Sequence, residues 1–250
     1  SKPTSELVAH WARSLLVTRP GSQARMTLDP KHVHRLAESI RYLKSLGFRD
    51  VAVANANYEA WTQQHFKELA QQLEEVSALV ESSFREGAPF NLTVFKYYIA
   101  KLIIPRAESR SIPVERQPCG AGKGYLMVDH RGDIDGADED VEVGGDFKLG
   151  NIFEPGFNHE LQKVFLDFDH LEEHKLSCET CPVNEVCGGF CPAANVSSTG
   201  SLYTPHDAFC LWSQMLYEFA DRVYVSLRGD DAAYARLLED VQTATSDGQR

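Results

Sequence analysis

The sequence predicts an α/β protein in two parts, with its cysteines concentrated in the second part. Strand and helix signals alternate through residues 1–106, whereas the segments that follow carry more Pro, Gly and Ser and only short strand signals. Five of the six cysteines lie between Cys178 and Cys210. With 250 residues and 43% hydrophobic content, the chain is long enough to bury a substantial core.

The order of elements in residues 1–106 predicts a parallel sheet. Helical spacing of apolar residues predicts a helix near residues 6–16, a second helix that starts at Asp29-Pro30 and stops at Gly47, and a long third helix that carries Trp61. Strands are predicted at Ala24–Leu28, Asp50–Asn55 and Asn91–Phe95. This β-α-β-α-β order implies parallel strands joined by right-handed crossovers.

The predicted sheet is narrow and leaves an open edge. Parallel sheets are normally buried on both faces, and an unpaired strand edge is usually covered. Two ways of covering this open edge fit the sequence equally well. One is a second copy of the chain or a different protein, which would make the chain part of a homo- or hetero-oligomer. The other is internal, through the amino-terminal helix and the cysteine-rich part.

Residues after 106 predict a hairpin and further helices. The segments Gly124–Val128 and Asp133–Ile134 flank His130-Arg131-Gly132, which has the composition of a hairpin turn. The later elements are expected to be a strand at Phe147–Ile152, a helix at His159–Phe168, an amphipathic helix at Cys210–Leu227 and a short helix at Asp231–Val241.

The cysteine spacing indicates a metal site. The run is Cys178-x2-Cys181-x5-Cys187-x3-Cys191-x18-Cys210. An x2 spacing lets two sulfurs converge on one metal from a tight turn, and thiolates are the soft ligands that hold iron–sulfur clusters or zinc. Disulfides are the alternative that an even cysteine count permits, but the chain shows no secretory signal.

Composition excludes two kinds of partner. The formal charge of −11 and the pI near 5.3 argue against nucleic acid, because phosphate contacts need a basic face. No apolar run approaches the length of a membrane span, so no membrane insertion is expected. An acidic, thiol-rich chain without a signal sequence fits the reducing cytoplasm.

Two features near the cysteines have weaker signals. The acidic stretch Asp133-Ile-Asp135-Gly-Ala-Asp138 offers oxygen ligands for calcium but lacks a complete calcium loop, so a solvated acidic hairpin is expected. His206 lies close enough in sequence to Cys210 to line the metal pocket, but a surface-loop position is the expected one.

The motifs of the second part carry a resemblance to a known family. They are Pro118-Cys119-Gly-Ala-Gly122, Val128-Asp-His-Arg-Gly-Asp-Ile134, Phe147–Ile152, the cysteine run with Cys187-Gly-Gly-Phe-Cys191-Pro-Ala-Ala-Asn195, and Thr199-Gly200, Pro205 and Cys210. Together they resemble the SPASM domain of radical SAM peptide maturases, and the preceding β-α-β-α-β segment is similar to the second half of the radical SAM partial (β/α) barrel. The resemblance implies a half-barrel at 1–106, a SPASM-like iron–sulfur domain with a β-hairpin at 107–228, and a C-terminal helix and tail at 229–250.

The chain departs from the family pattern in its first part. Radical SAM enzymes bind their catalytic cluster through a Cys-x3-Cys-x2-Cys loop, whereas this chain has no such motif and no cysteine before Cys119. The first half of the barrel is also missing. By itself the chain is therefore not expected to bind or cleave S-adenosylmethionine (SAM). Either a separate chain supplies the missing half, or this chain is a fragment of a longer protein.

A second departure concerns the auxiliary clusters of the family. The spacing Cys119-x12-Gly132-x4 leads to Ala137, where the family carries a cysteine, so the chain is a degenerate member that lacks one ligand. The resemblance assigns Cys178, Cys181, Cys187 and Cys210 to the other cluster. One four-iron four-sulfur (4Fe-4S) cluster is therefore expected there, with Zn²⁺ as the alternative. Cys119 and Cys191 would lie together as free thiols, a redox-sensitive pair or two ligands of a further metal.

Three functions follow from these expectations. The first is an accessory iron–sulfur protein in peptide maturation, of the kind that modifies ribosomally made (RiPP-like) peptides. It would bind a peptide substrate or a partner maturation enzyme, would not be catalytic alone, and would either relay electrons or stabilise the domain. The second is a zinc-binding scaffold, because four cysteines bind zinc tetrahedrally. The third is one half of a split radical SAM enzyme.

Overall fold

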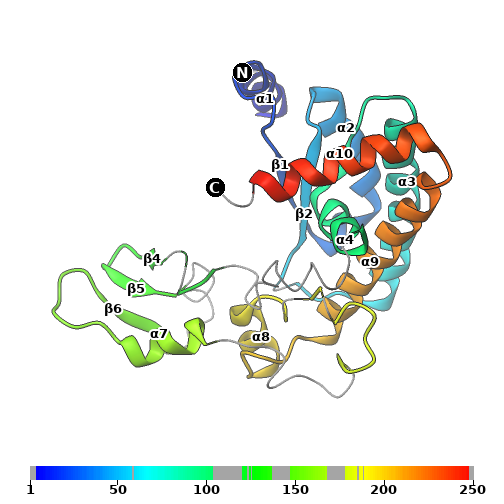
Figure 1. The fold of residues 1–250 in the computed structure, drawn as a ribbon. Coiled ribbons are helices and arrows are strands. Elements are labelled where there is room, and N and C mark those ends of the chain that lie inside the picture. Colours follow the sequence, from blue (N-terminus) through cyan, green and yellow to red (C-terminus); the bar gives the residue numbers. More distant parts are fainter. Residues whose placement is uncertain are drawn as a thin grey trace. The chain divides into compact units, whose positions relative to one another are not determined.

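The computed structural model describes residues 4–57, 59–103, 120–122, 124, 126–136, 147–167, 178–184, 186–187 and 189–247. Contacts divide the chain into two compact units (Figure 1). The first unit is Ser1–Pro105 together with Gln214–Arg250, and the second is Arg106–Ser213. The C-terminal part of the chain, from Gln214 onward, therefore belongs to the same unit as residues 1–105. Cys119, Ala137 and Asp138 lie outside the described residues.

A three-stranded parallel sheet forms the centre of the first unit. Its strands are β1 (Ala24–Leu28), β2 (Asp50–Asn55) and β3 (Asn91–Leu92), in the order β1-β2-β3. Ala24 pairs with Val51, and Asp50 pairs with Asn91. The first two strands have the bounds that the sequence predicts. Both crossover connections contain helices, as the β-α-β-α-β pattern requires.

The crossover helices begin and end at capping residues. The Asp29 carboxylate accepts a hydrogen bond from the Lys31 N–H at the start of the 3-10 helix η1 (Pro30–Arg35). The helix α2 (Leu36–Leu46) follows and ends at Gly47, whose φ of 109° suits glycine. The structure therefore divides the single helix predicted between Asp29-Pro30 and Gly47 into a 3-10 helix and an α-helix. The long helix α3 (Gln63–Arg85) starts with a capping box at Thr62.

The third strand is shorter than predicted, because residues 93–95 belong to a helix. The helix α4 (Thr93–Ile103) follows β3 directly, which makes the prediction of a strand at Asn91–Phe95 wrong beyond Leu92. Phe95 and Ile99 lie four residues apart and are both fully buried, so they form one helical face. The β-branched and aromatic residues of this segment favour a strand locally, and burial of that face overrides the preference.

Part of the sheet's surface is exposed in the described chain. Burial alternates along β1, where Ala24 and Leu28 are buried while Arg25 and Thr27 are exposed. Among the described strands, β1 pairs only with β2. The described part of the chain therefore leaves this side of β1 uncovered, and its covering by a partner stays a prediction.

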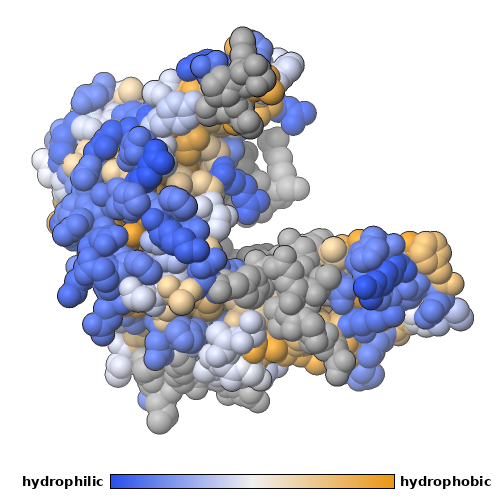
Figure 2. Space-filling model, turned by 180° about the vertical axis from the view of Figure 1, so that it is seen from behind, coloured by the Kyte–Doolittle hydropathy of each residue, from blue (hydrophilic) through white to orange (hydrophobic). Residues whose placement is uncertain are grey.

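The amino-terminal helix α1 (Thr4–Thr18) also has an exposed apolar face. Ala9 is buried, and α1 contacts α2. Leu7, Trp11 and Leu15 recur every four residues, so they share one face, and they are 49%, 63% and 43% exposed. Hydrophobic surface is correspondingly visible near this helix and on the strands of the second unit, whereas the other helices of the first unit present mostly hydrophilic surface (Figure 2). No helix in the described ranges is long and apolar enough to cross a membrane.

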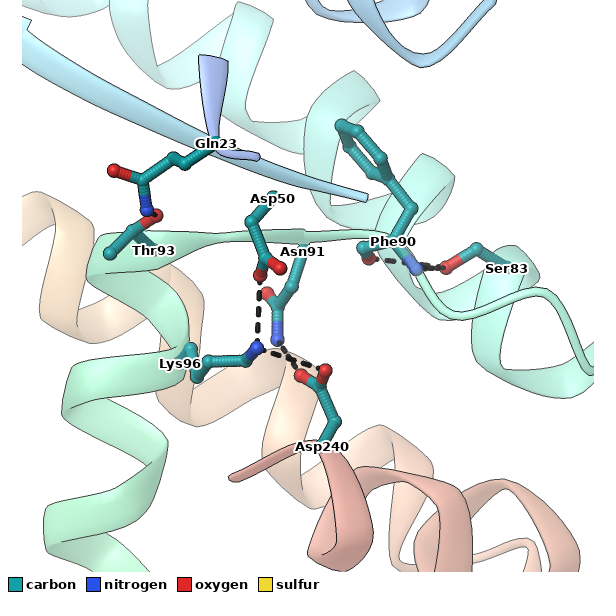
Figure 3. A network of polar contacts seen from close by, with 8 residues as sticks. All are labelled: Gln23, Asp50, Ser83, Phe90, Asn91, Thr93, Lys96 and Asp240. Atoms are coloured by element: carbon teal, nitrogen blue, oxygen red, sulfur yellow. Dashed lines mark hydrogen bonds and ion pairs between the residues drawn. The ribbon is translucent and has the colours of Figure 1, made fainter. Parts of the chain in front are cut away.

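A buried lysine connects the C-terminal helix to the sheet. The helices α9 (Asp207–Leu227) and α10 (Asp231–Asp247) follow the cysteine segment, and α10 contacts α3 and α4. Lys96 Nζ lies 2.9 Å from a carboxylate oxygen of Asp50 and 2.9 Å from one of Asp240. Asn91 donates a further bond of 3.2 Å to Asp240, so strands β2 and β3 and helices α4 and α10 meet at this network (Figure 3).

The second unit contains a small antiparallel sheet. Its strands are β4 (Met127–Val128), β5 (Asp133–Asp135) and β6 (Lys148–Asn151), and the helix α7 (His159–Leu166) follows. The predicted hairpin is confirmed between β4 and β5, with the Gly132 N–H bonded to the Asp129 carbonyl. Asp135 is buried rather than solvated. Burial raises the pKa of its carboxyl, and the charges of Asp129 and Asp133 add to this effect.

Phe165 of α7 packs closely against two glycines near this sheet. It forms a small core with Ala121 and Leu149. A Cβ on Gly122 would lie 2.6 Å from the Phe165 side chain, and one on Gly136 would lie 2.7 Å from it. The two glycines also bond to each other, from the Gly122 N–H to the Gly136 carbonyl. Residues with a side chain therefore cannot replace either glycine without moving Phe165.

We expect Gly122→Ala to loosen this sheet strongly. Its φ of 66° opposes a side chain, and the added methyl group would also overlap Phe165, so it should destabilise the sheet by about 1–3 kcal/mol more than backbone strain alone. Gly200→Ala is the matched control, since Gly200 has a φ of 75° and open space around it. Hydrogen exchange of the β5 and β6 amides measures the effect. Equal exchange in the two variants would show that the contact with Phe165 is unimportant.

Candidate metal centre

Successive tight turns form the segment that carries the first three cysteines of the run. The Cys181 N–H bonds to the Cys178 carbonyl at 3.1 Å, and the Cys187 N–H bonds to the Val183 carbonyl at 2.7 Å. Pro182 follows Cys181 within these turns and favours the reversal of the chain. Val183 is only 2% exposed, so its side chain anchors the segment.

The fourth cysteine lies in the first turn of α9. The Cys210 N–H bonds to the His206 carbonyl at 3.2 Å. His206 itself is exposed, and its Nδ1 accepts a hydrogen bond of 3.1 Å from the Ala208 N–H. His206 therefore caps the helix and does not line the pocket, which agrees with the expected surface position. The amino-terminal end of α9 places positive dipole near Cys210, which favours a thiolate.

All four cysteines of the predicted ligand set line one pocket. Cys178, Cys181, Cys187 and Cys210 line a small pocket that is partly open to solvent. The remaining lining residues are Val183, Asn184, Gly189, Tyr203, Pro205 and Ser213. Cys191 does not line this pocket, although it lies inside the cysteine run. That the four pocket cysteines are ligands and Cys191 is not stays a prediction.

The fifth described cysteine has a different place in the fold. Cys191 is the N-cap residue of the helix α8 (Pro192–Thr199), which the sequence analysis did not predict. Pro192 occupies the first turn, where its missing N–H costs nothing. The five described cysteines are not joined in disulfide bonds. The predicted neighbour of Cys191 is Cys119, which lies outside the described residues, so that pairing stays a prediction.

The pocket offers thiols, the type of ligand that holds iron–sulfur clusters and zinc. Burial raises the pKa of the Cys187 thiol, and the nearby Cys181 and Cys178 add to this effect, whereas N–H donors from Gly189 and Phe190 act in the opposite direction. Like-charge repulsion among these sulfurs is what a bound cation relieves. In the described ranges, no three His, Cys, Asp or Glu side chains lie close enough together to bind a single metal ion.

The fold resembles a known enzyme. A solved structure of a tagged anSMEcpe with bound AdoMet aligns over 92% of this chain with a TM-score of 0.57 and 17% sequence identity. The chain shares its fold with part of that enzyme. The neighbour is an anaerobic sulfatase-maturating enzyme of the radical SAM/SPASM type, and this chain spans 61% of the neighbour's length. No protein-family model and no curated protein matches the sequence.

Some features of the site have no signal in the amino-acid sequence. Tyr203 and Ser213 line the pocket, and neither carries a sequence signal for metal binding. Asn195 is part of the motif that carries the resemblance, but its contacts depend on how two loops meet. The positive φ of Phe190 has no sequence signal, because phenylalanine rarely adopts it.

Proposed function

We propose that this chain is a SPASM-type iron–sulfur protein that acts as an accessory in peptide maturation and does not cleave SAM by itself. In this proposal residues 1–106 are a radical SAM-like half-barrel, and residues 107–228 are a SPASM-like domain. The single observation that carries the proposal is the pocket, which contains the four predicted ligand cysteines and leaves out Cys191. The fold of the radical SAM/SPASM neighbour supports the same interpretation.

The proposed ligands of one 4Fe-4S cluster are Cys178, Cys181, Cys187 and Cys210. When bound, such a cluster would supply one-electron redox chemistry or structural stabilisation. The protein supplies four thiols, N–H donors to Cys187 and an apolar wall formed by Val183, Tyr203 and Pro205. Apolar walls limit access of water to a cluster and thereby tune its reduction potential.

Metal analysis after anaerobic purification tests this proposal. We expect about four iron and four sulfide per chain and a broad visible band near ~400 nm. One zinc per chain without iron or sulfide would instead support a zinc-binding scaffold and refute the cluster. Incubation of the reduced protein with SAM should yield no 5′-deoxyadenosine from this chain alone. Formation of that product by the chain alone would refute the accessory role.

We also propose that a partner covers the exposed strand edge and helix face of the first unit. The partner is a β/α segment that adds a parallel strand to β1 and packs an apolar side against Leu7, Trp11 and Leu15. The exposure of these side chains and of Arg25 and Thr27 supports the proposal. It also supports the third candidate function, in which a second chain completes a split enzyme.

Trp11→Glu is expected to weaken this association. The substitution places a charge on the apolar face, so we expect the association to weaken at least tenfold. The apparent mass measured by light scattering should then fall toward that of the monomer. Leu166→Glu is the matched control, because Leu166 is an exposed apolar residue of α7 in the other unit. Loss of association in both variants would point to general apolar contacts, and a wild-type chain that is monomeric without a partner would restrict the proposal to a different protein.

A further inference from the structure

The loop between Cys187 and Cys191 has an unusual backbone. Gly189 and Phe190 are consecutive residues with φ values of 78° and 67°. Glycine adopts this left-handed region readily, whereas the Cβ of phenylalanine makes it unfavourable. Phe190 is the only residue other than glycine with a positive φ among the described residues. Strain of this kind persists only where the surrounding structure holds it.

Two backbone N–H groups of this loop point at a cysteine sulfur. The backbone N–H groups of Gly189 and Phe190 both donate hydrogen bonds to the Cys187 Sγ. The chain must then join the Gly189–Phe190 peptide to α8, which begins directly after Cys191, and the left-handed conformation of Phe190 makes this connection. With both ends of the loop held, a different conformation at Phe190 would force that peptide, and the Phe190 N–H with it, to reorient.

A buried asparagine holds this loop in place. Asn195 of α8 is fully buried, and its Nδ2 donates to the Gly189 carbonyl at 2.8 Å and to the Leu202 carbonyl at 3.0 Å. One side-chain amide therefore connects the cysteine loop with the segment that leads to α9. The Asn195 Oδ1 has no hydrogen-bond partner in the described structure, so the contribution of this residue comes from its two donors.

The Phe190 ring makes a second connection to the fourth cysteine. It stacks on Phe209 with 4.1 Å between the ring centroids and 18° between the planes. Phe209 is 4% exposed and directly precedes Cys210 in α9. Phe190 thus interacts near two of the pocket cysteines: its N–H donates to Cys187, and its ring packs on the residue before Cys210.

We propose that Asn195 and Phe190 are positioning residues that fix Cys187 and Cys210 and aim two backbone N–H groups at the Cys187 sulfur before any metal binds. The part of this inference that concerns reduction potential rests on the proposed cluster. Hydrogen bonds to a ligand sulfur stabilise the more negative, reduced form of a cluster, so these N–H groups raise its reduction potential.

Amide hydrogen exchange in the metal-free protein tests the positioning directly. The amides of Gly189 and Phe190 are expected to exchange at least tenfold more slowly than unprotected amides in the wild type, and to lose this protection in Asn195→Leu. The matched control is Asn151→Leu, because Asn151 Nδ2 also donates two hydrogen bonds, to the Arg131 carbonyl and to Asp133. Unprotected amides in the wild type, or equal losses in the two variants, would overturn the proposal.

A pair of substitutions at Phe190 keeps the test decisive if Asn195→Leu does not fold. Both Phe190→Gly and Phe190→Val remove the stacked ring, but only valine opposes the left-handed backbone. We expect the glycine variant to retain the protection of the two amides within about twofold and the valine variant to lose it. If both variants behave alike, the backbone conformation of Phe190 does not position Cys187.

In the iron-loaded protein, measurement of the reduction potential distinguishes a positioning role of these residues from a general effect on stability. Asn195→Leu and Phe190→Val should lower the potential, Phe190→Gly should lower it less because the left-handed backbone is kept, and Asn151→Leu should leave it unchanged even if it lowers the stability. If the reduction potentials of the four variants change in parallel with their stabilities, the inference about the reduction potential is wrong. If the protein holds zinc, the proposed function fails, while the exchange experiment on the metal-free protein still decides the positioning.

Discussion

Cys187→Ser is expected to remove the metal from this protein almost completely. Serine offers a hard oxygen with a far higher pKa than a thiol, so it is a poor substitute for a thiolate ligand. Since Cys187 lies in the pocket with Cys178, Cys181 and Cys210, iron and sulfide should fall from about four per chain to near zero, and the band near ~400 nm should disappear. Elemental analysis and absorption spectra of anaerobically purified protein measure this loss.

The control for this experiment is another cysteine of the same run. Cys191 caps α8 and does not line the pocket, so Cys191→Ser should keep the full iron content and spectrum. Because metal binding and folding are coupled, the stability of both variants should be compared in the metal-free state as well. Loss of the cluster in Cys191→Ser with retention in Cys187→Ser would reverse the proposed ligand assignment.

Lys96→Met is expected to destabilise the first unit by about 3 kcal/mol, through the loss of the cation between Asp50 and Asp240. This value is at the low end for a buried ion pair because solvent still screens both carboxylates. Urea unfolding followed by circular dichroism measures it. Arg35→Met is the control, since the Arg35–Glu38 pair is exposed and its loss should leave the unfolding midpoint unchanged.

A variant that also removes the carboxylate charges distinguishes an ion pair from simple packing. The destabilisation of Lys96→Met comes largely from two uncompensated carboxylates, so adding Asp50→Asn and Asp240→Asn should restore part of the lost stability. If the triple variant is less stable than Lys96→Met alone, packing of the lysine stem rather than its charge accounts for the effect.

The same network gives the stability a defined pH dependence. Burial opposes the charge on Lys96, but charges and hydrogen bonds from Asp240 and Asp50 outweigh it, so the pKa of Lys96 is raised in the folded state. A raised pKa contributes stability that is fully present below the unfolded value of about 10.4 and is lost as the pH rises through the folded value. The stability difference between wild type and Lys96→Met should therefore be constant near neutral pH and shrink in alkali.

Much of the local structure could be predicted from residue patterns. The strands Ala24–Leu28 and Asp50–Asn55 and the helix end at Gly47 have the predicted positions, because apolar periodicity and a left-handed glycine are encoded by neighbouring residues. Thr93–Phe95 was predicted wrongly, because its strand propensity competes with burial of a helical face that only the folded chain provides.

The sequence by itself determined where the thiols cluster, because the spacing of cysteines within tight turns is a local property. The prediction that Cys178, Cys181, Cys187 and Cys210 form one ligand set without Cys191 came from a family resemblance. Only the tertiary structure decided that Phe190 adopts a left-handed backbone beside Cys187, that Asn195 connects two loops, and that Lys96 joins two carboxylates. These features depend on contacts between segments distant in sequence, whose mutual placement no local pattern specifies.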